Sequence, residues 1–372
     1  MKNFIRKFYP MRKKLKIAQI APLWYPVPPK GYGGTEAIVS KLTEGLIKRG
    51  HNVTLFASGD SKTKAKLVPT SKKNLFSLKV PWLANSYNIL NLIEAFSRAK
   101  EFDILHTHID VYDPIFRDSC PVPTIATLHN PFWPKTKTKT GSFYEYKARV
   151  LIYNRFAKLP YVAISNSFQK QCPANIKFVK TIYHGVDISK LKFNPKPENC
   201  FVWLGRLTPN KGLHLAVKIA RQLGLELLIA GKAVSPENEK YFKKEIKPYL
   251  SKKIKFVGEI KTDKEKSEFL GKGRALIYPL LWEEPFGIVM IEAMACGTPV
   301  IAFARGAAPE IVKNGKTGFL VKNLNGGMKK AIKNIEEISR IQCRQRVEKL
   351  FTVEKMVEEY EKLYEQIIKN RI

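Results

Sequence analysis

Short apolar segments recur along the chain, and each is followed by a loop and then by a stretch with helical periodicity. The first apolar segment is Lys16–Ala21, after which a loop rich in proline and glycine leads to a predicted helix at Glu36–Arg49. Short apolar runs that end at polar residues are typical of parallel strands covered on both faces. Repeated units of this kind form doubly wound sheets that bind ligands at the carboxyl ends of their strands. We therefore predict an α/β fold.

The apolar segments form two series, separated by the polar and proline-containing stretch Ser189–Asn199, which we interpret as a linker. A chain of 372 residues also favours two cores over one. The predicted strands are Lys16–Ala21, Asn52–Ala57, Ile104–Thr107, Thr124–Leu128 and Tyr161–Ile164, then Phe201–Gly205, Leu225–Ala230, Ile254–Val257, Ala275–Pro279 and Pro299–Phe303. The predicted domains are a basic extension at 1–14, an N-terminal domain at 15–188, a linker at 189–199, a C-terminal domain at 200–351 and a helix at 352–372.

The five cysteines are scattered and lack C-x-x-C spacing, which indicates a reducing compartment and argues against a disulfide framework or a cysteine zinc site. No apolar run is long enough to span a membrane, and the basic N-terminus leads into a strand instead of a signal-peptide core. We therefore expect a cytoplasmic protein.

The net charge of +33 comes from 65 basic and 32 acidic residues. Three explanations stay open: phosphate-bearing ligands, an anionic membrane surface and a general lysine bias. No zinc-finger spacing or RNA-binding aromatic motif is present, so we predict no nucleic-acid partner.

The segment Trp282–Val300 carries two glutamates, Glu284 and Glu292, separated by seven residues. A Pro-Phe-Gly sequence opens the apolar run between them, and we expect its proline in the first turn of a helix whose free amides attract anions. At 1.5 Å per helical residue the two acids lie at most about 12 Å apart, which matches the scale of a nucleoside diphosphate sugar. The alternative is a buried helix whose glutamates face water, but a carboxylate in so apolar a run needs a partner.

The segment Gly205–Gly212 (GRLTPNKG) lies between the first strand of the second series and a predicted helix at Leu213–Leu223. Arg206 offers a planar fork for phosphate oxygens and Lys211 a point charge, both beside helix amides. Lysine is common in this chain, so the spacing alone is weak evidence. The position carries more weight, because nucleotides bind at the first strand-to-helix turn of such domains.

These two segments resemble the signature of the family 4 retaining glycosyltransferases, which have the GT-B architecture of two Rossmann-like domains facing a central cleft. The resemblance extends from Leu15 onward and implies transfer of a hexosyl group from a nucleotide sugar, with a last helix that crosses back to the first domain. Three further segments resemble the subgroup of avilamycin-pathway and tetrahydrobiopterin glucosyltransferases, which favours UDP-glucose: Pro22–Pro29, Phe56–Ser61 and Gly231–Ala233.

By this resemblance, Arg206 and Lys211 hold the donor diphosphate and stabilise it as it leaves. Glu284 binds hydroxyls of the donor sugar, Glu292 binds the ribose, and backbone amides at 286–288 contact phosphate. Two cations and a helix N-terminus replace the metal ion of other glycosyltransferases. No D-x-D motif occurs, so we predict no metal and no cofactor.

In the first domain, Gly31–Glu36 is not a dinucleotide fingerprint, because that motif requires glycine at Glu36. Gly33 and Gly34 permit close backbone approach to a ligand, and the resemblance places this loop at the donor phosphate and sugar. The alternative is a flexible turn. His129 follows a predicted strand, where the resemblance places a functional histidine; the alternative is a buried structural one.

The candidate catalytic residues are therefore His129, Arg206, Lys211 and Glu284, and the candidate donor-binding residues are Gly33, Gly34, Gly205, Arg206, Lys211, Glu284, Phe286, Gly287, Ile288 and Glu292.

The pair His106 and His108 suggests metal chelation, but we expect the two rings on opposite faces of their strand and interpret the pair as mainly structural. The region Lys135–Arg155 mixes lysine and arginine with aromatic residues. A solvated loop and helix is the preferred interpretation, and a surface for the acceptor or an anionic membrane is the alternative, with the inner membrane surface as its location.

Other classes of function stay open. Two carboxylates also suit a hydrolase, which we discount because one of them is placed for the ribose. A sugar-nucleotide epimerase shares the two-domain plan, and a non-catalytic sugar-nucleotide-binding protein would keep the same residues. The acceptor is not readable from the sequence: pterin, lipid, glycan and antibiotic precursors are all compatible with it.

Overall fold

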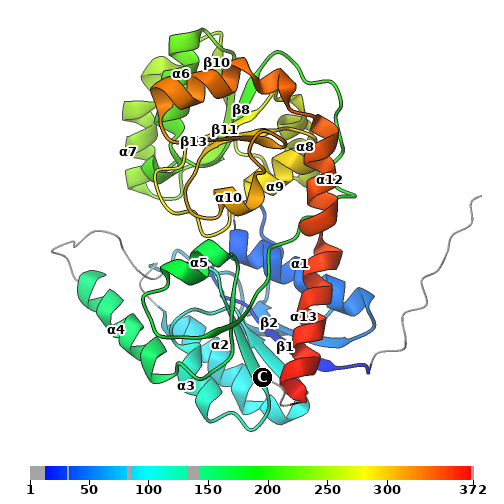
Figure 1. Ribbon diagram of the computed structural model, residues 1–372. Helices are drawn as coiled ribbons and strands as arrows, with labels where there is room; N and C mark the ends of the chain where they lie inside the picture. The colour runs from blue at the N-terminus through cyan, green and yellow to red at the C-terminus, as the bar shows by residue number, and fades with distance from the viewer. Residues whose placement is uncertain (1–12, 32, 82–84, 132–141, 370–372) are drawn as a thin grey trace, which may run out of the picture.

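The computed structural model describes residues 13–31, 33–81, 85–131 and 142–369 and has two domains, one above the other (Figure 1). Each domain is built on one parallel sheet with helices on its faces, which confirms the predicted α/β class with two Rossmann-like domains. The described residues form seven strands in the first sheet and six in the second.

The N-terminal domain contains β1 (Lys16–Ile20), α1 (Gly34–Lys48), β2 (Asn52–Ser58), β3 (Lys66–Ser71), α2 (Ser86–Ser97), β4 (Ile104–Thr107), α3 (Asp113–Asp118), β5 (Thr124–Leu128), α4 (Ser142–Arg155), β6 (Tyr161–Ala163), α5 (Asn166–Gln171) and β7 (Phe178–Thr181). The strand order is β3-β2-β1-β4-β5-β6-β7. Neighbouring side chains of a strand point to opposite faces. Ile17 accordingly packs in the core against α1, whereas Ala18 packs in the core on the α2 side.

The C-terminal domain contains β8 (Phe201–Arg206), α6 (Leu213–Leu223), β9 (Leu227–Lys232), α7 (Pro236–Glu245), β10 (Ile254–Gly258), α8 (Asp263–Lys272), β11 (Leu276–Tyr278), α9 (Ile288–Ala295), β12 (Val300–Phe303), α10 (Ala308–Ile311), β13 (Gly318–Val321), α11 (Lys329–Lys333) and α12 (Arg340–Leu350). Its strand order is β10-β9-β8-β11-β12-β13. Strands β8 and β11 lie at its centre, so the loops after them meet in the middle of the carboxyl edge.

The last helix, α13 (Val353–Ile368), leaves the C-terminal domain and lies on the N-terminal one (Figure 1). Thr352 caps it by accepting a hydrogen bond from the Lys355 amide at 3.1 Å. Its apolar face has helical spacing and packs with α1: Met356, Val357, Tyr360, Leu363, Tyr364 and Ile367. Glu361 on this helix is 2% exposed and accepts a 2.6 Å bond from Arg49 Nη2. Both packing and charge therefore hold this helix on the N-terminal domain. The domain boundaries given above stay predictions.

No helix among the described residues combines the length and the apolar character that crossing a bilayer requires.

Candidate functional site

A buried ion pair forms the centre of the site in the C-terminal domain. Lys211 follows β8, and its Nζ is paired with Glu284 Oε2. Trp282 Nε1 donates to the same oxygen at 2.9 Å, and Lys211 Nζ lies 4.9 Å from the centroid of the Trp282 ring. Lys211 is 8% exposed and Glu284 is 6% exposed. Both hydrogen bonds fall on Oε2, so Glu284 Oε1 receives none from the described residues.

Arg206 lies beside this pair, at the last position of β8, where Gly205 precedes it. Burial lowers the pKa of Lys211, Glu284 opposes that effect and the Arg206 guanidinium adds to it. Arg206 is partly exposed, whereas Lys211 is buried. The structure thus brings together three predicted residues from two segments, and their two cations and one anion leave net positive charge at the carboxyl edge of the sheet.

Helix α9 begins at Ile288, shortly after this acid. Gly287 caps it with φ of +89°, a left-handed conformation that favours glycine, and a Cβ there would lie 3.2 Å from Glu284 Cγ. Pro285 and Phe286 precede the helix, so the prediction of proline in its first turn is wrong, because the chain must first turn at Gly287. Ile288 is the first helical residue, and its amide belongs to the free N-terminal set that attracts anions.

Glu292 lies further along α9 and has a different partner from Glu284. It is 7% exposed, and its Oε1 accepts a 2.8 Å bond from Lys266 Nζ of α8. The charge of Glu292 raises the pKa of Lys266. Lys41 of α1 faces the same group from the other domain: burial lowers its pKa, and Glu292 opposes that shift. Glu292 therefore lies where the two domains meet, and neither lysine beside it was predicted from the sequence.

A hollow of about 300 Å³ opens at the carboxyl ends of β8, β9 and β10, next to Arg206. Its lining includes Leu207, Lys232 and Glu259, and Lys232 Nζ lies 3.2 Å from Glu259 Oε2. The first domain reaches this hollow, because a Cβ on Gly31 would lie 2.5 Å from Glu259 Oε1. Of the three segments that resemble the avilamycin-pathway subgroup, only Gly231–Ala233 lines this hollow.

The glycine loop of the first domain leads directly into α1, which begins at Gly34, two residues before the predicted start. Gly33 has φ of +149°, and a Cβ there would lie 2.6 Å from Pro29 Cβ, so the turn requires glycine. Glu36 is 4% exposed in the first turn of α1, and burial raises its pKa to about 7. Gly33 and Gly34 thus stand at the helix end, while Gly31 makes the contact with the other domain.

Buried histidines form the N-terminal half of the site. His129 follows β5, is 6% exposed, and its Nε2 lies 2.9 Å from His108 Nδ1. Its ring also stacks on His184, with centroids 5.3 Å apart, and His184 lies 4.9 Å from Phe286 of the C-terminal domain. His184 therefore links His129 to the segment that joins Glu284 to α9. Burial lowers the pKa of His129 to about 3, so its ring is neutral.

The rings of His106 and His108 lie on the same face, with centroids 4.0 Å apart, so the expectation of opposite faces is wrong. Residues two apart in a strand return to the same face because the side-chain period is two. In the described ranges, no group of three or more His, Cys, Asp or Glu side chains has an arrangement that could hold a metal ion. His184 was not predicted in this cluster, since it follows β7 and meets β5 only in the folded chain.

Further contacts join the domains at the edge of this site. Ser165 Oγ donates to the Pro285 carbonyl at 2.7 Å. Glu310 of the C-terminal domain accepts bonds from the amides of Asn166 and Ser167, at 2.9 and 2.6 Å, and so caps α5 of the other domain. Tyr183 donates to the same carboxylate at 2.8 Å. The two halves of the site are thus held in contact.

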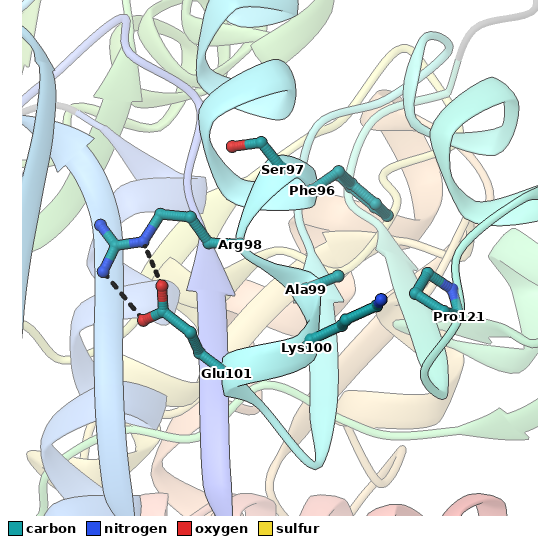
Figure 2. A pocket seen from close by; sticks show the side chains of 7 residues that line it. All are labelled: Phe96, Ser97, Arg98, Ala99, Lys100, Glu101 and Pro121. Atoms are coloured by element: carbon teal, nitrogen blue, oxygen red, sulfur yellow. Dashed lines mark hydrogen bonds and ion pairs between the residues drawn. The ribbon is translucent and has the colours of Figure 1, made fainter.

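A larger hollow, of about 530 Å³, lies on the N-terminal domain away from these residues (Figure 2). At its rim, the Arg98 guanidinium donates two hydrogen bonds to the Glu101 carboxylate, at 2.8 and 2.9 Å. It is bordered by segments that precede β4 and β5, at the amino ends of the strands, whereas ligands of such sheets bind at the carboxyl ends. We assign no function to it.

Residues 132–141, the first part of the basic and aromatic region, lie outside the described residues, as do Tyr32 of the glycine loop and most of the N-terminal extension.

Two Rossmann-like domains that meet across a charged edge define the GT-B architecture. Residues 32–190 match the family described as Glycosyltransferase Family 4, and residues 187–349 match Glycosyl transferases group 1. The chain belongs to the family 4 glycosyltransferases and is a glycosyltransferase enzyme.

The relatives agree with this assignment. An uncharacterized glycosyltransferase of Methanocaldococcus jannaschii is 26% identical over 318 residues, which cover 79% of this chain and 86% of the relative. Two solved structures share the fold. AviGT4, a glycosyltransferase involved in avilamycin A biosynthesis, has a TM-score of 0.69 at 20% identity and covers 96% of this chain and 98% of its own. HepE of Anabaena, in complex with UDP-glucose, has a TM-score of 0.72 at 22% identity, covering 95% and 100%.

Proposed function

We propose that this enzyme transfers a hexosyl group, glucosyl by preference, from a UDP-linked donor to a hydroxyl acceptor, with retention of configuration and without a metal ion. The buried pair of Lys211 and Glu284 beside Arg206 carries the proposal. It offers two cations for a diphosphate and one carboxylate with a free oxygen for sugar hydroxyls.

The proposed donor lies along the carboxyl edge of the second sheet. Its diphosphate meets Arg206, Lys211 and the amides at 286–288, and its sugar meets Glu284. Its ribose meets Glu292, whose Oε2 accepts no hydrogen bond from the described residues. Its base occupies the hollow beside Leu207 and Lys232. The UDP-glucose complex of HepE, a protein of the same fold, supports the choice of a UDP-linked sugar.

In the proposed reaction, the bond between the anomeric carbon and the phosphate oxygen breaks as the acceptor hydroxyl attacks the same face. The departing phosphate oxygen takes the acceptor proton, so no separate base is needed. The cations stabilise the negative charge that grows on the diphosphate, and they do so in a largely buried environment where such stabilisation is strong. The free amides at the start of α9 act in the same direction.

The acceptor is proposed to bind on the N-terminal side, near His129. Its identity stays open among the classes given above, and membership of the avilamycin-pathway subgroup stays a prediction. Contact of residues 135–155 with an anionic membrane also stays a hypothesis, which sedimentation with anionic vesicles tests: absence of binding contradicts it.

The test of the donor is a thermal-shift screen of UDP-glucose, UDP-galactose, UDP-N-acetylglucosamine and GDP-mannose. A ligand that binds only the native state raises the melting temperature. We expect UDP-glucose to give the largest rise, and proton NMR of the transfer product to show the anomeric configuration of the donor. A larger rise with GDP-mannose contradicts the UDP assignment, and an inverted product contradicts retention.

A further inference from the structure

Four of the six histidines of the chain lie together in the N-terminal half of the site. His106, His108, His129 and His184 are at most 6% exposed. Burial lowers the pKa of all four, so each ring is neutral and carries one proton on one of its two nitrogens. Which nitrogen carries that proton decides what each ring offers to a ligand.

Gln19 of β1 sets the direction of the hydrogen bonds. Its carbonyl oxygen, Oε1, lies 2.8 Å from His108 Nε2 and can only accept, so His108 is protonated on Nε2. The other nitrogen of His108, Nδ1, must then accept. It lies 2.9 Å from His129 Nε2, so His129 donates through Nε2. His129 Nδ1 is left with a lone pair, and it is buried without a hydrogen-bond partner among the described residues.

Tyr364 of the C-terminal helix contacts the amide nitrogen of the Gln19 side chain. Gln19 Nε2 donates to the Tyr364 hydroxyl of α13 at 3.0 Å, and that hydroxyl lies 2.6 Å from His106 Nδ1. His106 Nε2 in turn lies 2.8 Å from Thr127 Oγ1. Each side chain of this network thus has a hydrogen-bond partner, as buried polar groups require.

We propose that His108, oriented by Gln19, is a positioning residue that fixes the tautomer of His129, so that His129 Nδ1 accepts a hydrogen bond from a hydroxyl group of the transferred sugar. The inference rests on the proposed function. A neutral lone pair suits a hydroxyl donor and does not attract phosphate oxygens, which accept but do not donate. His184 stacks on the His129 ring and also contacts Phe286, which brings the His129 ring near the segment that follows Glu284.

The first experiment measures the tautomer directly in the full-length protein without any ligand. Nitrogen-15 NMR of protein labelled at histidine distinguishes the two tautomers by the chemical shifts of Nδ1 and Nε2. Loss of one signal set in His129→Gln assigns the His129 resonances. We expect His129 to carry its proton on Nε2. A proton on Nδ1 overturns the inference, whereas the donor assignment is unaffected by either result.

The second experiment tests the role of His108. In His108→Leu we expect His129 to lose its fixed tautomer, and kcat/KM for UDP-glucose to fall roughly tenfold, as loss of one hydrogen bond in the transition state predicts. Inhibition by UDP, which lacks the sugar, should be unchanged. His108→Gln, whose amide can accept from His129 and donate to Gln19, should recover most of the activity. An unchanged tautomer in His108→Leu overturns the inference, as does an equal loss of UDP inhibition.

Discussion

The two halves of the cleft share a fold but differ in their chemistry. The C-terminal half is charged: Lys211, Glu284 and Arg206 lie together, and Glu292 is paired with Lys266. The N-terminal half is built from neutral rings, with His129 held by His108. A charged diphosphate needs fixed cations, whereas an uncharged sugar needs donors and acceptors of defined direction. This difference fits the proposal that the diphosphate binds in the C-terminal half and that the sugar lies between Glu284 and His129.

The largest effect is expected from the charged half. Lys211→Ala removes a cation that we propose stabilises the departing diphosphate, and we expect turnover to fall about 1,000-fold, in line with the loss of one preorganised electrostatic contact. The measurement is kcat with UDP-glucose at a temperature well below the melting point, because Glu284 left unpaired also destabilises the fold.

The matched control is Lys218→Ala, which removes an exposed lysine from α6 and should leave kcat unchanged. Near-normal turnover in Lys211→Ala contradicts the assignment of the charged half.

A smaller effect is expected from the neutral half. His129→Ala removes the proposed hydrogen-bond acceptor for the sugar, and we expect kcat/KM to fall at least about tenfold. Inhibition by UDP should be the same as in the wild-type enzyme, because UDP has no transferred sugar. Competitive inhibition assays with UDP make this comparison, and a parallel loss of UDP affinity would show that the halves do not divide the substrate in this way.

Buried acids in the two halves should also differ in their effect on stability. Glu284 has a lysine partner, whereas burial alone raises the pKa of Glu36 to about 7. The unfolded value is near 4.5, so the contribution of Glu36 is fully present below pH 4.5 and is lost as pH rises through 7. Above pH 7 we therefore expect Glu36→Gln to have a free energy of unfolding about 3 kcal/mol higher than wild type.

Urea denaturation between pH 5 and 8, spaced by about one unit, measures this difference. Glu268→Gln, at an exposed position of α8, is the control and should follow the wild-type curve. A pH-independent difference between Glu36→Gln and wild type contradicts the raised pKa.

The smallest effect is expected from metal removal. If two cations and the start of α9 replace a metal, EDTA should leave the initial rate unchanged, and added Mg²⁺ or Mn²⁺ should not raise it. A rate that EDTA abolishes and Mn²⁺ restores contradicts the proposed metal independence.

The fold was largely predictable because its central strands are continuous apolar runs. Three strands were missed: β3, β7 and β13, all at sheet edges. Their partial exposure weakens the apolar pattern, and β3 also contains Pro69, which an edge strand tolerates. The sequence therefore indicates the buried centre of a sheet more clearly than its borders.

The grouping of Arg206, Lys211 and Glu284 was predictable, because these residues lie in two recognisable motifs. Pairings between elements far apart in the chain were not, including Lys266 with Glu292 and His184 with His129. The shared face of His106 and His108 was predictable from the strand period of two, and our expectation there was in error.

The most direct test of the account is a crystal structure of the enzyme with UDP-glucose bound. The account predicts phosphate oxygens within hydrogen-bond distance of Arg206 and Lys211, and a sugar hydroxyl within that distance of both Glu284 and His129 Nδ1. A diphosphate bound against the histidines, or outside the crevice of Lys211 and Glu284, would contradict it.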